Sequence, residues 1–302
     1  MEKRNNIDLF GGVVLVAFSA LLGLNQVLIK LVNAGMDPVF QAGLRSLCAF
    51  FPVLIFAWLM RRKLSLSDGS LLPGLLSGLL FGVEFIMLFK ALDYTSVARA
   101  SLFFYTMPFW VAIGAHWWLP GERLNRLRVF GLLLAFIGVM IALLNSSHSL
   151  GREALLGDAL CLVAATFWAA IALLTRLSSL SRARPEMQLL YQLGVSAPIL
   201  LILAFVTGDI LREPTPIIWG IFLFQVLVVV SVGFLTWFWV LSIYPAADMA
   251  VYAFLAPVFG VFFGWLILNE HIGWHLLVAL TLVALGIVLV NRRSTGKSTK
   301  RV

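Results

Sequence analysis

The sequence predicts an all-α integral membrane protein with ten transmembrane helices, arranged as two inverted repeats of five. Three observations support this fold class: the composition, the spacing of the apolar stretches, and a repeat of the first half in the second. The chain has 302 residues, of which 61% are hydrophobic and 12% charged, with a mean hydropathy of +1.00. Because a soluble domain is only about half apolar, this composition indicates a chain that lies in lipid.

Ten apolar stretches have the length of about 20 residues that a helix needs to cross a bilayer core. Their connections are short and leave no room for a soluble domain. The first stretch follows a basic start, as in a signal peptide, but it is too long for one and is expected to be retained as a helix. The predicted helices cover residues 9–32, 38–60, 71–91, 95–118, 127–145, 155–175, 187–207, 216–240, 246–268 and 272–291.

Basic residues lie at the ends of the predicted helices and gather on one side of the membrane. With ten helices, sixteen of the 22 Lys and Arg residues face the same side, among them Arg61, Arg62 and Lys63. The positive-inside rule then places both termini in the cytoplasm. The net charge of +8 is a topology signal, because binding of nucleic acid would require these charges on one folded face. No nucleic-acid partner is expected.

The sequence lacks the motifs of enzymes and metal sites. Cys48 and Cys161 both fall inside predicted helices, and neither indicates a disulfide or a metal ligand. The Gly-rich phosphate loop of an ATP-driven pump and the Gly-x-Ser-x-Gly nucleophile motif are both missing. We therefore expect no cofactor, no metal and no enzymatic activity.

The second half of the chain repeats the first with an offset of about 148 residues. Glu122 matches Glu270, and Gly138 matches Gly286, both at an offset of 148. Elsewhere the offset drifts by a few residues, as insertions and deletions in loops would cause. The chain is therefore expected to consist of two homologous five-helix units.

The second unit is predicted to lie upside down relative to the first. Residues 1–150 and 151–302 each hold five predicted helices, and an odd number reverses the direction of the second copy. Loop charges agree with the inversion: the loop after the fourth helix carries three arginines, whereas its counterpart, residues 269–273, carries none. Inverted repeats are a common plan of secondary transporters, which hold their substrate near the membrane midplane between the halves.

Two segments carry a resemblance to a known family. They are NQVLIKLVNAGMDPVFQAGLRSLCAF (25–50) and ALDYTSVARASLFFYTMPFWVAIGAHWWLPGERL (91–124). They resemble the drug/metabolite transporter superfamily, specifically its EamA-type members with ten spans. The resemblance implies helices round a central cavity and export of amino acids or related metabolites across the bacterial inner membrane. A small-molecule substrate and the lipid bilayer are the implied partners, and a monomer is the expected assembly.

Charged and amide side chains inside the predicted helices are candidates for substrate binding. Arg45 and Glu84 each lie about seven residues from the same boundary, hence roughly 10 Å below it at about 1.5 Å per residue. Gln26 reaches a similar depth, and Gln41 shares a helix face with Arg45. Arg45 is suited to the carboxylate of a zwitterionic amino acid, and Glu84 to its ammonium group. The alternative is a structural ion pair near the outer gate, since isolated charges are costly at this depth.

Aromatic residues and prolines inside the helices complete the candidate site. Pro108 and Pro257 interrupt the backbone hydrogen bonding of their helices and are candidate hinges, because the freed carbonyls must face protein or water rather than lipid. Lys30, Lys90 and Arg99 lie closer to the boundary, where they are expected to extend their charges to the interface. The aromatic residues predicted either to line the cavity or to fill helix contacts are Tyr105, Trp168, Tyr191 and Tyr252.

Two other functions remain open from the sequence. The first is transport of a different solute class, such as a drug or a methylated cation. The second is a membrane-embedded enzyme acting on lipid, which would require clustered histidines or carboxylates near one interface. The sequence offers no such cluster, so secondary transport of amino acids is the leading hypothesis.

Overall fold

The computed structural model describes residues 8–62, 64–119, 126–149, 151–208, 210–233, 236, 240 and 255–291. Within these ranges the chain is helical, apart from turns and one isolated bridge between Met36 and Leu211. The elements are α1 (Leu9–Asn33), α2 (Pro38–Leu59), α3 (Leu71–Tyr94), α4 (Val97–Phe104), α5 (Met107–Trp118), α6 (Arg126–Ser149), α7 (Gly151–Leu177), the 3-10 helix η1 (Ser179–Arg182), α8 (Pro185–Thr207), α9 (Pro216–Phe224), the π-helix η2 (Gln225–Val232), α12 (Leu255–Leu268) and α13 (Trp274–Asn291).

Six of the described helical segments are long and apolar enough to cross a membrane: α1, α2, α3, the α4–α5 segment, α7 and α8. Each begins and ends within a few residues of a range predicted from the sequence. Three shorter apolar segments lie at 216–232, 255–268 and 274–286. Large apolar side chains cover the outer faces, which suits lipid and not water; examples are Trp58, Leu72, Val206, Ile217 and Trp265. The chain is a multi-pass membrane protein.

Helix starts are set by short polar side chains and by proline. The Asp37 Oδ1 atom accepts hydrogen bonds from the backbone N–H groups of Val39 and Phe40, 2.8 and 3.0 Å away. This satisfies two of the four donors that a helix start leaves unpaired. Pro38 follows Asp37 as the first residue of α2, a position where its missing N–H is not needed. The same arrangement of N-cap and proline opens α9 at Thr215.

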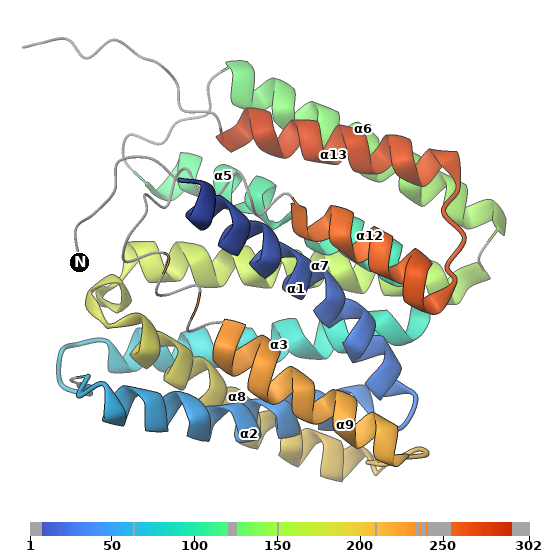
Figure 1. The fold of residues 1–302 in the computed structure, drawn as a ribbon. Coiled ribbons are helices and arrows are strands. Elements are labelled where there is room, and N and C mark those ends of the chain that lie inside the picture. Colours follow the sequence, from blue (N-terminus) through green and yellow to red (C-terminus); the bar gives the residue numbers. More distant parts are fainter. Residues whose placement is uncertain are drawn as a thin grey trace, which may run out of the picture.

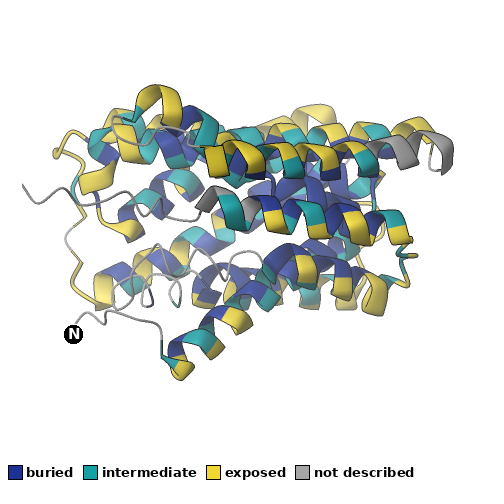
Figure 2. Ribbon diagram, turned by 90° about the horizontal axis from the view of Figure 1, so that it is seen from above, coloured by how far each residue is buried: buried dark blue, intermediate teal, exposed yellow. Residues whose placement is uncertain are grey.

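Elements from both halves of the sequence alternate in space (Figure 1). α13 lies beside α6 at one edge of the bundle, while α8 lies beside α2 near the opposite edge. Between them, α1 packs on α12, and α3 packs on both α7 and α8. Buried residues gather along these helix contacts, and exposed residues face outward (Figure 2).

Glycines allow the backbones of the two halves to come close together, as is common in lipid. A Cβ atom on Gly138 would lie 2.8 Å from the Ala279 carbonyl oxygen, and one on Gly286 would lie 2.5 Å from the Gly131 carbonyl oxygen. These two contacts are reciprocal, because the offset of 148 residues converts each into the other. A Cβ atom on Gly23 would likewise lie 2.6 Å from the Gly260 nitrogen.

The α4–α5 segment is broken in its middle. α4 ends at Phe104, and α5 begins at Met107 with Pro108 in its first turn. The Thr106 hydroxyl donates to the Phe103 carbonyl oxygen at 2.6 Å and satisfies one of the acceptors that the break exposes. The interruption thus lies where Pro108 predicts it. Pro257 is buried in the first turn of α12.

Candidate functional site

Arg45 and Glu84 lie on facing helices in the interior of the bundle. The Arg45 side chain from α2 lies against α3, with its Cζ atom 4.7 Å from the ring centroid of Phe85 and 4.6 Å from that of Phe89. Only 4% of Arg45 and 3% of Glu84 is exposed. Cation–π contact with two rings stabilises the buried guanidinium. The structure therefore brings the two predicted charges together.

Arg45 and Glu84 are not bonded to one another. Arg45 Nη1 and Glu84 Oε2 are buried without a hydrogen-bond partner, and none of the ion pairs among the described residues joins them. Leaving a buried polar group unpaired costs about 1–3 kcal/mol, and more for a charged group. The site thus offers one cationic donor and one anionic acceptor inside the fold.

Gln41 contacts Gln225, a residue that the sequence pattern does not single out as a candidate. Its Nε2 atom donates to Gln225 Oε1 at 3.2 Å, and neither side chain is exposed. Gln41 Oε1 and Gln225 Nε2 have no partner. Gln225 is the first residue of the π-helix η2, a rare helix type that is frequent at functional sites. The signal in the sequence is a lone amide within the apolar run IFLFQVLVVV (221–230).

Gln26 lies where α1, α4 and α12 meet. Its Oε1 atom accepts a hydrogen bond from the Ser101 hydroxyl at 2.5 Å, and its Nε2 atom has no partner. A Cβ atom on Gly260 would lie 2.0 Å from the Ser101 Oγ atom, so only glycine fits there. We group five buried residues, each with a side-chain atom that lacks a hydrogen-bond partner, as the central polar cluster: Gln26, Gln41, Arg45, Glu84 and Gln225.

Tyr105 and Trp168 contact one another at the break between α4 and α5. The Trp168 ring stacks on Phe104 with a centroid distance of 4.8 Å, and its edge-to-face contact with Tyr105 spans 6.1 Å. Both candidate residues therefore face the interrupted part of the span.

Tyr191 lies elsewhere, and Tyr252 lies outside the described residues. The Tyr191 hydroxyl is 3.2 Å from the Ser70 hydroxyl at the start of α3, and its ring packs against Gly74. Gly74 is ten residues from Glu84 on α3, or roughly 15 Å at about 1.5 Å per residue. The structure does not bring Tyr191 to the charged pair.

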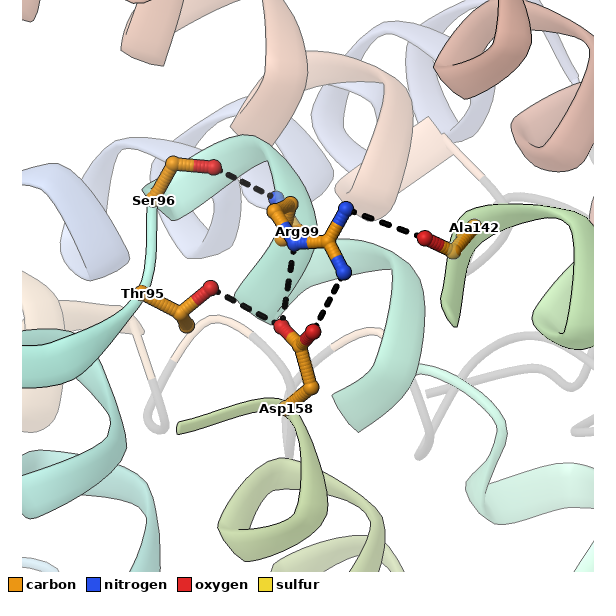
Figure 3. Close-up of polar contacts among 5 residues, drawn as sticks. All are labelled: Thr95, Ser96, Arg99, Ala142 and Asp158. Carbon is orange, nitrogen blue, oxygen red and sulfur yellow. Dashed lines mark hydrogen bonds and ion pairs between the residues drawn. The ribbon is translucent and has the colours of Figure 1, made fainter. Parts of the chain in front are cut away.

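Arg99 is buried and paired, so the expectation that it extends to the interface is wrong. Its Nε and Nη2 atoms bind the two carboxylate oxygens of Asp158, and its Nη1 atom donates to the Ala142 carbonyl oxygen at 3.2 Å (Figure 3). The Thr95 hydroxyl donates to Asp158 Oδ1 at 2.8 Å. Asp158 is fully buried, and Arg99 is 6% exposed. The bidentate contact joins α4 to α7.

Further polar contacts surround this pair where α3 ends and α4 begins. The Glu270 carboxylate accepts from the Val97 and Ala98 N–H groups at 2.7 and 2.9 Å, and so caps α4. Arg212 Nη2 donates to Asp93 Oδ2 at 2.6 Å, and this hydrogen bond raises the pKa of Arg212 above its usual value. The Lys30 ammonium group donates to the Thr95 carbonyl oxygen at 2.5 Å. We call the following residues the end network: Lys30, Asp93, Thr95, Arg99, Asp158, Arg212 and Glu270.

Comparison with known proteins yields one family and several relatives. The model of the EamA-like transporter family matches residues 9–144 and 155–292. The uncharacterized transporter YoaV of Bacillus subtilis is 25% identical over 278 residues, covering 91% of this chain and 94% of the relative. A probable amino-acid metabolite efflux pump of Salmonella typhimurium is 30% identical over 281 residues, covering 88% and 90%.

A solved crystal structure has a similar fold. It superposes with a TM-score of 0.64 and 19% sequence identity, covering 92% of this chain and 96% of that chain. At this identity the similarity describes the arrangement of the helices and nothing about the substrate.

Proposed function

Because the chain belongs to the EamA-like transporter family, we propose that it exports amino acids or related small metabolites by alternating access. Family membership makes it a transporter, and the choice of substrate class is the proposal. The name of the Salmonella relative, a probable amino-acid metabolite efflux pump, supports that class. The proposed location is the bacterial inner membrane, with both termini in the cytoplasm as the basic loops predict.

The observation that carries the substrate class is the unpaired state of Arg45 and Glu84. A zwitterionic amino acid has a carboxylate and an ammonium group on one carbon, and these groups are complementary to Arg45 Nη1 and Glu84 Oε2, which lack partners. The planar guanidinium favours a carboxylate, with which it forms parallel hydrogen bonds. One bound substrate would then give both atoms a hydrogen-bond partner.

The architecture that we propose is the ten-helix plan of two inverted five-helix repeats, residues 1–150 and 151–302, round a central cavity. The reciprocal contacts of Gly138 and Gly286 support a twofold relation between the halves. Pro108, at the break in the α4–α5 segment, and Pro257 are the proposed hinges. Rocking of one half against the other would expose a substrate held between them to each side in turn.

The aromatic residues have a supporting role in this proposal. Tyr105 and Trp168 contact one another at the interrupted span. We propose that they line the cavity next to the hinge at Pro108. The Phe85 and Phe89 rings are already occupied by Arg45. A drug-like or methylated cation would compete with that guanidinium for the same ring faces, so this alternative is less favoured than a zwitterion.

The test is uptake of labelled amino acids into proteoliposomes, with and without a pH gradient. We expect at least one amino acid to be transported, and the initial rate to fall about 10- to 100-fold in Arg45→Met and in Glu84→Gln, because each loses a charge-assisted hydrogen bond. Arg62→Met is the matched control, since Arg62 pairs with Glu186 away from the cluster and should transport normally.

Two results would contradict the proposal. If no amino acid is transported or stabilises the purified protein against heat, the substrate class is wrong. If Arg45→Met and Glu84→Gln transport as well as Arg62→Met, the pair does not contact substrate. Transport that ignores the pH gradient would exclude proton coupling and leave facilitated diffusion.

A further inference from the structure

We propose that Gln41 and Gln225 form a second subsite, which selects substrates whose side chain carries a neutral group that both donates and accepts hydrogen bonds. Hydroxyl and carboxamide side chains have this property. The inference rests on the proposed function, since it assumes that Arg45 and Glu84 hold the main-chain groups of an amino acid.

The hydrogen-bonding capacity of the two amides carries the proposal. Each glutamine has one carbonyl acceptor and one NH2 donor, and the pair is joined by a single hydrogen bond of 3.2 Å. One carbonyl oxygen, of Gln41, and one NH2 group, of Gln225, remain without a partner although both residues are fully buried. A single hydroxyl or carboxamide would satisfy both, because it accepts from the NH2 group and donates to the carbonyl.

The position of the amides relative to Arg45 fits a side-chain subsite. Gln41 precedes Arg45 by four residues on α2, so the two side chains share a face about one helical turn apart, roughly 5.4 Å. Gln225 comes from η2, which packs on α2, so both halves of the sequence contribute to the subsite.

Other interhelical glutamines differ from this pair. Gln192 Nε2 donates to the Ser77 hydroxyl at 3.3 Å and Gln188 Nε2 donates to two carbonyl oxygens, those of Leu180 and Ala183, at 3.0 Å. Neither side chain has a buried atom without a partner, so a structural role accounts for each. The Gln41–Gln225 pair joins helices as well, but only this pair leaves a donor and an acceptor available among these glutamines.

The experiment compares substrates of equal shape in proteoliposomes. Threonine and valine form one isosteric pair, and asparagine and leucine form another. We expect the wild-type protein to prefer threonine and asparagine by at least about tenfold in initial rate, because their apolar counterparts leave both amide atoms unpaired. In Gln225→Met and in Gln41→Met the preference should fall to about twofold or less, because no amide pair remains to distinguish the two side chains.

Gln192→Met is the matched control, because it removes an interhelical glutamine bond outside the cluster and should keep the wild-type preference. A wild-type protein that transports amino acids without preferring threonine over valine or asparagine over leucine would overturn the subsite and leave the proposed function intact. This measurement needs no variant, so poor folding of a variant does not affect it. If no amino acid is transported, the proposed function and the subsite both fail. A preference that persists in folded Gln225→Met would also overturn the subsite.

Discussion

The end network and the central polar cluster are both groups of polar side chains, partly buried in the end network and fully buried in the cluster, but they differ in how completely their hydrogen bonds are formed. In the end network, Asp158 uses both carboxylate oxygens and Glu270 uses both of its own. In the central polar cluster, every member has at least one buried atom without a partner. Since more than about nine in ten buried polar groups in proteins are paired, the contrast separates polar residues with complete hydrogen bonding from the residues that we propose to bind substrate.

This difference has a physical consequence for stability. Removing one partner from a satisfied pair leaves the other buried and uncompensated, which is costly. Removing groups that were unsatisfied from the start eliminates a cost that was already present. Mutations in the two regions should therefore change the free energy of unfolding in opposite directions. Only mutations in the central polar cluster should lower transport through lost contacts with substrate.

The largest expected effect is that of Asp158→Ala. Arg99 would remain buried with its two bonds to the carboxylate lost, and the free energy of unfolding should fall by about 3–5 kcal/mol. Chemical denaturation in detergent micelles, followed by tryptophan fluorescence, measures the change. The double variant Arg99→Met/Asp158→Leu serves as control and should recover most of the loss, because no buried charge remains. Wild-type stability of Asp158→Ala would show that the pair does not hold α4 to α7.

The second prediction concerns the same kind of change in the central polar cluster. Arg45→Met/Glu84→Met should raise the free energy of unfolding by about 1–3 kcal/mol, because both unpaired charges are replaced by apolar side chains of similar length. Transport of amino acids should be lost. The paired readout of denaturation and uptake distinguishes this result from simple misfolding, and a double variant less stable than wild type would contradict the contrast between the two regions.

The sequence predicts features that depend on residues close together in the chain better than contacts between residues far apart in it. Helix positions follow from local apolar stretches, and the shared depth of Arg45 and Glu84 follows from counting residues along consecutive helices. The Arg99–Asp158 pair joins residues 59 positions apart, and its formation depends on how α4 rotates against α7, which residue spacing alone does not specify. Residue spacing therefore predicts an interfacial position for Arg99, and this prediction is wrong.

Gln225 and Tyr191 show the same limit. Gln225 is a single amide in an apolar run, and its role becomes visible only when η2 packs on α2. The position of Tyr191 inside a predicted helix makes it a candidate, but the close approach of α3 and α8 directs its side chain toward Gly74 and Ser70. Depth in the membrane is readable from sequence, whereas the direction in which a side chain points requires the packed structure.

The third prediction tests the Glu270 cap of α4. Glu270→Gln keeps the shape of the side chain but removes the charge that binds the Val97 and Ala98 N–H groups, and it should lower the free energy of unfolding by about 1 kcal/mol. Glu213→Gln is the control, because Glu213 is exposed and its loss of charge should change stability by less than about 0.5 kcal/mol. Equal effects of the two substitutions would mean that the cap contributes no stability.

The smallest effect is expected at the edge of the end network, where Arg212 pairs with Asp93. The Arg212 side chain is 41% exposed, so water and salt screen the pair, and Arg212→Ala should cost only about 0.5 kcal/mol at low salt.

The hydrogen bond from Arg212 to Asp93 raises the pKa of Arg212. The stability that Arg212 contributes is therefore complete below the pKa of unfolded arginine and is lost only as the pH rises through the higher folded value. Between pH 7 and pH 9 the cost of Arg212→Ala should therefore be constant, whereas about 1 M salt, with a screening length of about 3 Å, should reduce it. Melting temperatures of wild type, Arg212→Lys and Arg212→Ala at two salt concentrations measure this. A cost as large as that of Asp158→Ala, unchanged by salt, would mean that Arg212 belongs with the buried pairs and not at a solvated edge.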